Sequence, residues 1–237
     1  MSDIIVEADE LCVDFPIKEI PPEMKTAEGG AAPGATARFV EYGGQAYLRA
    51  LDHVSFRIEP GERIGIWGKN GAGKTTLLRA MRGVYPPTSG KLNVVGATQS
   101  LFNLAFGLND DATGWENIIL RGVLMGATPE EMYEKSERIA DFSELGPFLD
   151  MPLRSYSSGM RMRLAFSVAT ELPSDILLMD EWISVGDVDF RKKVSDRLQA
   201  QLQDTRILLI ASHNRVLLDQ ICTRTMTLSE GRIVEWS

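Results

Sequence analysis

The stretch that decides the fold is Gly68-Lys69-Asn70-Gly71-Ala72-Gly73-Lys74-Thr75, which fits the pattern G-x-x-x-x-G-K-[ST]. Its glycines let successive backbone N–H groups turn inward as an anion-binding nest, and the helix that follows points its positive end at the same place. An apolar strand pattern at residues 64–67 precedes the stretch and a helical pattern at 74–82 follows it, as a phosphate-binding loop requires. The sequence therefore predicts a nucleoside-triphosphate site.

The loop pattern also assigns roles to individual side chains. We expect Lys74 to reach the β- and γ-phosphates and the Thr75 hydroxyl to ligate Mg²⁺. The nucleotide-binding residues predicted from the loop and the start of its helix are Gly68, Asn70, Gly71, Ala72, Gly73, Lys74, Thr75 and Thr76.

An acidic motif supplies the partner that such a loop needs. Asp175-Ile176-Leu177-Leu178-Met179-Asp180-Glu181 reads as a strand buried on both faces that ends in two carboxylates. We expect Asp180 to hold Mg²⁺ from the side opposite the loop threonine, and Glu181 to orient or deprotonate the attacking water. By itself such a run is as often a strand that meets a solvated turn, but downstream of a phosphate-binding loop it predicts hydrolysis.

Composition excludes several classes of protein. The 237 residues are 44% apolar and 24% charged, as in globular proteins, and 25 Lys+Arg against 33 Asp+Glu give a net charge of −8. This acidic balance argues against non-specific nucleic-acid binding. The two cysteines, Cys12 and Cys222, are too few for a disulfide framework or a cysteine-based zinc site and favour a reducing compartment. No secretory signal and no apolar run of the ~20 residues needed to span a bilayer is visible.

Strand and helix patterns alternate along most of the chain, which predicts an α/β fold with a mostly parallel sheet. Between residues 111 and 170 helical signals dominate instead. There Thr128-Pro129-Glu130-Glu131 combines an N-cap, a proline at the first helical position and a glutamate three residues after the cap. Residues 16–47 are rich in proline and glycine and predict an exposed, flexible insertion. The aromatic end of this insertion, with Tyr42 and Tyr47, either pins a surface loop or docks on a partner.

Three further motifs follow in a fixed order. Tyr156-Ser157-Ser158-Gly159-Met160 precedes the acidic strand, Ser184-Val185-Gly186-Asp187 follows it, and Ser212-His213-Asn214 follows the next strand. In this order the chain resembles the nucleotide-binding domain of ABC transporters, over all but residues 16–47. The resemblance implies one P-loop ABC-type domain over residues 1–237, with an antiparallel β edge. It also implies a helical subdomain at 111–170 that carries the signature motif.

The resemblance further implies a homodimer that sandwiches ATP, each site pairing the phosphate-binding loop of one copy with the signature motif of the other. Ser157, Ser158 and Gly159 then correspond to signature positions, and Ser157 can be a plain helix N-cap at the same time. His213 corresponds to the histidine that senses the γ-phosphate. Asp187 corresponds to the residue of the D-loop that crosses the dimer interface.

Two positions implied by the family stay open. Phe15 falls where an aromatic ring stacks on adenine, although Tyr42 or Tyr47 are alternatives. Counting back from Thr113-Gly114-Trp115-Glu116-Asn117 places the Q-loop near Asn103 or Leu104, and Gln99 comes too early in the chain.

The variant signature, with Tyr156, Ser158 and Met160 in place of the usual leucine, glycine and glutamine, is similar to that of ATPases that export polysaccharides such as O antigen, capsule or teichoic acid. This implies an ATPase beneath two copies of a separate permease, peripheral to the cytoplasmic face of the inner (plasma) membrane, with a lipid-linked polysaccharide as cargo. Because the sequence ends at Ser237, no C-terminal carbohydrate-binding domain is expected. The alternatives are an exporter ATPase for another lipid or small molecule and, less favoured, an ABC ATPase that acts in DNA repair or translation.

Overall fold

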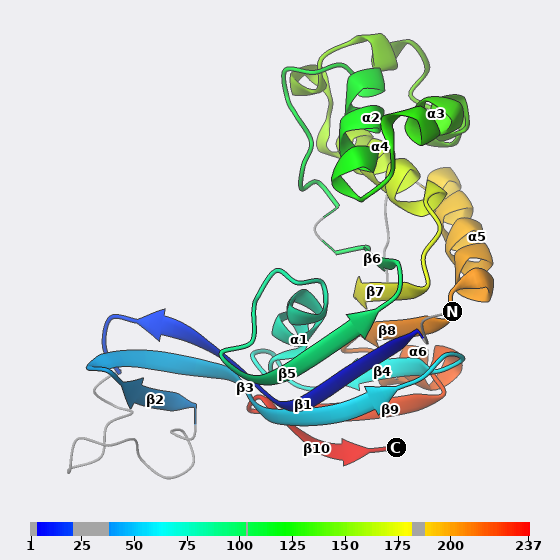
Figure 1. Ribbon diagram of the computed structural model, residues 1–237. Helices are drawn as coiled ribbons and strands as arrows, with labels where there is room; N and C mark the ends of the chain where they lie inside the picture. The colour runs from blue at the N-terminus through cyan, green and yellow to red at the C-terminus, as the bar shows by residue number, and fades with distance from the viewer. Residues whose placement is uncertain (1–3, 21–37, 103, 182–187) are drawn as a thin grey trace. The chain divides into compact units, whose positions relative to one another are not determined.

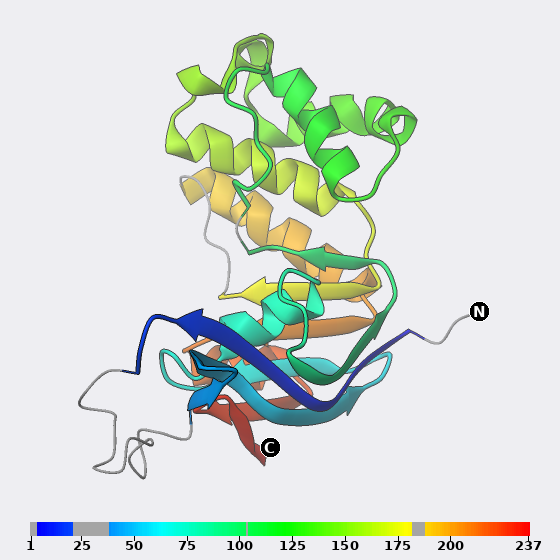
Figure 2. The ribbon, with the colours of Figure 1, turned by 60° about the vertical axis from the view of Figure 1, so that its left-hand side comes forward.

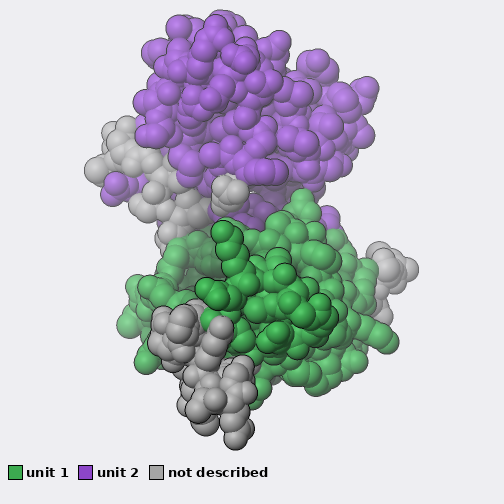
Figure 3. All heavy atoms as spheres, turned by 90° about the vertical axis from the view of Figure 1, so that its left-hand side faces the viewer, with its two compact units in different colours: residues 1–96, 179–181, 206–237 green, residues 97–178, 182–205 purple. Residues whose placement is uncertain are grey.

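The chain is described by a computed structural model at residues 4–20, 38–102, 104–181 and 188–237. Its contacts divide it into two units, which Figure 3 colours separately. Unit 1 takes in residues 1–96, 179–181 and 206–237, and unit 2 takes in residues 97–178 and 182–205. Strand β7 (Ile176–Asp180) is therefore divided: its last two residues belong to unit 1 and its first three belong to unit 2.

An antiparallel sheet forms one part of unit 1 (Figure 1). Its strands, in spatial order, are β2 (Phe39–Tyr42), β3 (Gln45–Ile58), β1 (Ile5–Ile17) and β5 (Ser89–Val95). Residues 54, 56 and 58 of β3 are buried whereas 55 and 57 are exposed, because successive side chains of a strand point to opposite faces. This sheet is the antiparallel edge that the sequence predicted.

The second sheet of unit 1 is mainly parallel, and the residues of the predicted phosphate site follow the ends of its strands. Its strands are β10 (Arg232–Trp236), β9 (Arg224–Ser229), β4 (Arg63–Trp67) and β8 (Ile207–Ala211), followed by the end of β7 (Ile176–Asp180). β4 pairs in parallel with both β8 and β9, whereas β10 returns antiparallel to β9. All five residues of β8 are buried, as expected for a parallel strand covered on both faces.

Two helices pack on these sheets. α1 (Lys74–Met81) contacts β3 and β5 of the antiparallel sheet and β8 of the parallel one, and its Leu77 and Leu78 are fully buried. α6 (Arg215–Ile221) packs on β4. α1 thus begins at the carboxyl end of β4 and is fixed on two sides, which holds the connecting loop in place.

Unit 2 is mainly helical (Figure 2). Its helices are α2 (Gly114–Leu124), α3 (Pro129–Ser143), α4 (Ser158–Glu171) and α5 (Val188–Asp204), with short 3₁₀ turns at Gly146–Asp150 and Leu153–Ser155. The fully buried side chains of Ile118, Met132, Ile139 and Leu164 form its core. The helices that the sequence placed in this region are therefore present.

Capping boxes start the first two helices of unit 2. Thr128 accepts from the N–H of Glu131 while the Glu131 carboxylate accepts from the N–H of Thr128, as predicted. Thr113 and Glu116 make the same reciprocal pair before α2. Each box satisfies backbone donors that a helix leaves without partners at its start.

Other parts of the chain differ from the prediction. The described ends of the predicted insertion are strands: β1 runs through Pro16 and Ile17, and β2 and the start of β3 form a hairpin over residues 39–47. Residues 21–37 of that insertion lie outside the described part. β10 and β6 (Thr98–Ser100), which pairs in parallel with β7 within unit 2, were not predicted. Within the described residues, no helix is long and apolar enough to cross a membrane.

Candidate nucleotide-binding site

The loop between β4 and α1 depends on glycine for its shape. Gly73, the N-cap of α1, has a φ of +109°, and a Cβ atom there would lie 2.8 Å from the carbonyl oxygen of Ala50. A Cβ on Gly68 would lie 2.3 Å from the carbonyl oxygen of Leu228. Both positions exclude any larger residue, because the obstructing atoms belong to the backbone and cannot move aside cheaply.

Lys74 places a cation inside this loop. Its side chain is buried, and Nζ donates to the carbonyl oxygens of Gly68 at 2.7 Å and of Lys69 at 3.2 Å. Burial lowers the pKa of Lys74, while the charges of Asp180 and Glu181 act in the opposite direction. The ammonium group is thus held where an anion in the loop would meet it.

The carboxyl end of β7 lies against the start of α1. Thr75 Oγ1 donates a hydrogen bond of 2.7 Å to Asp180 Oδ2, across 105 positions of sequence. A threonine hydroxyl beside a carboxylate is an all-oxygen donor set, which suits a hard cation such as Mg²⁺. These two residues therefore fit the metal role that the sequence predicted for them.

Glu181, which follows Asp180, is held by the segment after β8. Its N–H donates to the carbonyl of Ala211 at 2.8 Å, and its φ is +71°. Ser212 Oγ donates to one carboxylate oxygen at 2.8 Å, and the N–H of His213 donates to the other at 3.0 Å. His213 Nε2 lies 3.9 Å from the same carboxylate, whose side chain is 49% exposed. The arrangement fixes the carboxylate and leaves it accessible to water.

These groups line one cavity of about 510 Å³ within unit 1. The residues that line it are Phe15, Arg38, Leu48, Ala50, Asn70, Gly71, Ala72, Gly73, Lys74, Thr75, Thr76, Asp180, Glu181 and His213. The loop, both carboxylates and the histidine, predicted from separate stretches of sequence, are therefore brought together. Arg38 was not predicted, and no motif includes it.

Phe15 is the aromatic residue of this cavity. It is half-buried, and the ring of Tyr85 meets it edge-on with centroids 4.9 Å apart. Tyr85 in turn accepts a 3.0 Å hydrogen bond from Arg79 of α1. The alternatives, Tyr42 and Tyr47, stack on each other at 4.1 Å and are absent from the lining. The geometry favours Phe15 as the surface for a nucleotide base.

The signature segment lies in unit 2. Ser157 caps α4, accepting from the N–H of Met160 at 3.2 Å, and Ser157, Ser158 and Gly159 are all exposed. A Cβ on Gly159 would meet only Ser157 Oγ, at 3.9 Å, so packing within the unit does not require glycine there. Tyr156 is buried and donates to the carbonyl of Phe148 at 2.6 Å. Tyr156, which stands where the usual signature motif has leucine, therefore packs in the interior of unit 2.

The remaining predicted residues are not part of the described cavity. Asp187 and Asn103 lie outside the described residues. Leu104 is buried. Gln99 is buried in β6, where it donates to the carbonyl of Ala169 and accepts from Gln201 Nε2 at 2.6 Å, which is a structural role. The assignment of the Q-loop near Asn103 or Leu104 stays a prediction.

Known proteins are similar to this chain over most of its length. The family described as ABC transporter matches residues 51–184. The O-antigen export system ATP-binding protein RfbE of Yersinia enterocolitica is 38% identical over 214 residues, which are 90% of this chain and 87% of that protein. The teichoic acids export ATP-binding protein TagH of Bacillus anthracis is 37% identical over 190 residues, 80% of this chain but only 34% of TagH.

Solved structures share the fold. The ATP-binding cassette MJ0796, in a dimeric post-hydrolysis state bound to ADP and Pi, superimposes with a TM-score of 0.70 at 18% identity, over 98% of this chain and 97% of that one. A second dimeric structure of MJ0796, described as a bacterial ABC transporter cassette, gives a TM-score of 0.68 at 17% identity, over 98% of this chain and 97% of that one.

Proposed function

Because the chain belongs to the ABC transporter family, as an ATP-binding subunit with ATPase activity, we propose that it drives the export of a lipid-linked polysaccharide through a separate membrane permease. The observation that carries the ATP-hydrolysis part of the proposal is one cavity that is lined by Lys74, Thr75, Asp180, Glu181 and His213. This set has a cation for phosphate, oxygen ligands for a metal and a carboxylate open to water.

Each residue has a defined task in ATP hydrolysis under this proposal. The loop N–H groups and Lys74 bind the β- and γ-phosphates, and Thr75 with Asp180 holds Mg²⁺. Bound there, the metal neutralises charge that develops on the phosphate oxygens. Glu181 orients the attacking water and takes its proton, and His213 contacts the γ-phosphate. Phe15 provides the surface against which adenine stacks.

The choice of a polysaccharide as cargo is supported by the relatives. RfbE is named for O-antigen export and TagH for teichoic acid export, and both names describe ATP-binding proteins of exporters. The variant signature of this chain points to the same branch. Another lipid or a small molecule is the alternative cargo, because the same nucleotide chemistry serves any of them.

Exposed surfaces support two partners, a second copy of the chain and a permease. The signature residues at the start of α4 stand exposed, as they must to meet ATP held by a second copy, and the solved cassette MJ0796, which shares this fold, is dimeric. Exposed apolar side chains in unit 2, namely Phe106 at 76% exposure and Leu120, Val123 and Leu124 of α2, are suited to contact with a permease. We place this homodimer, with two permease copies, at the cytoplasmic face of the inner membrane.

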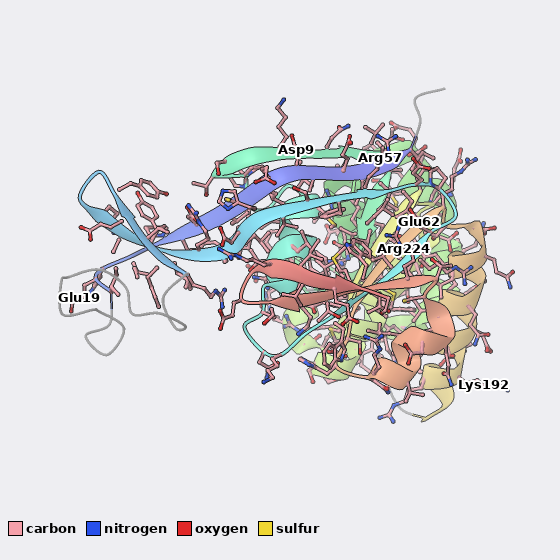
Figure 4. The ribbon with its side chains drawn as sticks, turned by 90° about the horizontal axis from the view of Figure 1, so that it is seen from below. Asp9, Glu19, Arg57, Glu62, Lys192 and Arg224 are labelled. Atoms are coloured by element: carbon pink, nitrogen blue, oxygen red, sulfur yellow. The ribbon has the colours of Figure 1, made fainter. Side chains whose placement is uncertain are left out.

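The ATPase part of the proposal is tested with Glu181→Gln, measured by phosphate release and by ATP-binding calorimetry. Loss of a general base should lower turnover roughly 10²–10⁴-fold while ATP still binds. Glu62→Gln is the matched control, because Glu62 pairs with Arg224 at 2.8 Å outside the cavity (Figure 4). Normal turnover of Glu181→Gln would remove Glu181 from this role.

The export part is tested by purifying tagged Glu181→Gln with ATP from detergent-solubilised native membranes, followed by mass spectrometry. A multi-span permease in roughly equal amount supports a transporter, and a co-purifying glycolipid identifies the cargo. Recovery with ribosomal or DNA-bound proteins, and no permease, would refute export and leave only the ATPase.

A further inference from the structure

Arg38 is a cation of the nucleotide cavity that no sequence motif includes. It lies just before β2, beyond residues 21–37, and it lines the same cavity as Phe15, the loop and Glu181. Its side chain is half-buried. A charged residue held at such a site requires partners, and its partners connect it to the loop.

Hydrogen bonds fix the guanidinium of Arg38 at two points. Nη1 donates to the carbonyl oxygen of Gly71 in the loop at 2.7 Å, and Nε donates to the carbonyl oxygen of Arg49 at 3.2 Å. The N–H of Arg49 donates back to the carbonyl of Arg38 at 2.6 Å. Arg49 itself pairs with both carboxylate oxygens of Asp14, at 2.9 and 3.1 Å. Arg38 thus bridges β3 and the phosphate-binding loop.

The balance of charges in the cavity indicates a role for Arg38 in phosphate binding. Among the described lining residues, the carboxylates of Asp180 and Glu181 oppose an incoming polyphosphate, and Lys74 and Arg38 are the lysine and arginine side chains that offset them. Nη2 of Arg38 makes no hydrogen bond to any described residue, whereas Nη1 and Nε are occupied. A planar guanidinium with a free N–H edge is well matched to a phosphate oxygen.

We propose that Arg38 binds a phosphate group of the nucleotide while it donates to the Gly71 carbonyl. Two cations of the same chain, Lys74 and Arg38, then contact the phosphates, and the site selects nucleoside di- and triphosphates. The proposal rests on the proposed function, since it assumes that this cavity takes a nucleotide. It gives the end of the predicted insertion a place in the nucleotide site.

The experiment is calorimetric titration of the purified full-length chain with MgADP. Arg38→Gln removes the charge at similar size and should weaken binding roughly 5- to 30-fold, the range for a charge-assisted hydrogen bond at a half-buried site. Arg38→Lys keeps the charge without the planar fork and should recover part of the loss. Arg57→Gln is the matched control: Arg57 lies on β3, pairs with Glu7 and Glu59, and is absent from the cavity lining (Figure 4).

Salt dependence separates a phosphate contact from a loop support. The titrations are repeated at two ionic strengths, because screening weakens an interaction between charges. Loss of a phosphate contact makes MgADP affinity less sensitive to salt in Arg38→Gln, and Arg38→Lys retains the sensitivity of the parent chain. A weakened affinity with unchanged salt sensitivity would overturn the phosphate contact.

Two other results are informative. Parent chain and Arg38→Gln binding MgADP equally would overturn this inference and leave the proposed function intact. A parent chain that does not bind MgADP would overturn the proposed function and this inference with it. Thermal unfolding of each variant confirms that the compared proteins are folded.

Discussion

Ser212 positions the proposed general base, and Ser212→Ala is expected to slow ATP turnover without weakening ATP binding. Its fully buried hydroxyl donates to Glu181 Oε2 at 2.8 Å, while the N–H of His213 holds the other oxygen at 3.0 Å. A hydrogen bond to a charged group contributes about 1.5–3 kcal/mol, which we reduce to about 1–2 kcal/mol because the carboxylate is half-exposed. If that amount is lost in the transition state, kcat falls roughly 5- to 30-fold.

The assay is steady-state phosphate release at saturating ATP, with ATP affinity measured separately by calorimetry. Ser143→Ala is the control, because Ser143 is also fully buried and its hydroxyl donates to the carbonyl of Ala140 at 2.8 Å, in unit 2. Both variants lose one buried hydroxyl, but only one of them loses a contact to Glu181. A kcat of Ser212→Ala equal to that of Ser143→Ala would show that Ser212 does not orient the carboxylate.

Two predictions concern packing and thiol chemistry. Gly122→Ala should lower the free energy of unfolding by about 1–3 kcal/mol, seen as a lower Tm, because its Cβ would lie 2.1 Å from Met132 Sδ in the core of unit 2; an unchanged Tm would mean that Met132 moves aside freely. Burial raises the pKa of the Cys222 thiol to about 12. At pH 8 iodoacetamide should therefore alkylate it roughly a thousandfold more slowly in the folded chain than after unfolding, as mass spectrometry can measure, and rapid labelling of the native chain would contradict this.

Local signals predicted much of the fold correctly. The strand, glycine loop and helix around Lys74, and the capping box at Thr128, depend on residues close in sequence, so their geometry follows from the order of side chains. The hairpin at residues 39–47 was included in the predicted flexible insertion, because Gly43 and Gly44 and the proline-rich residues before them masked the four-residue β2 and the start of β3. β6 has only three residues and is stabilised by pairing with β7, which no local pattern reveals.

The candidate site was predictable where residue type and order carry the chemistry. Lys74, Asp180, Glu181 and His213 were all named from their motifs, and they line one cavity. The choice among three aromatic residues was not predictable, because Phe15, Tyr42 and Tyr47 are equivalent until their rings are placed. The lining of the cavity separates them, because it includes Phe15, whereas Tyr42 and Tyr47 stack on each other away from it.

The sequence by itself determined the family, the α/β fold and the ATPase chemistry, because the glycine loop with Lys74, the strand-ending carboxylates and the later motifs carry that chemistry in residue types and spacings that are local. The tertiary structure alone decided which groups hold those residues in position. Ser212 meets Glu181 across 31 positions and Arg38 meets Gly71 across 33. Such contacts are set by which strands of a sheet become neighbours, and sheet pairing depends on the whole chain rather than on any local stretch.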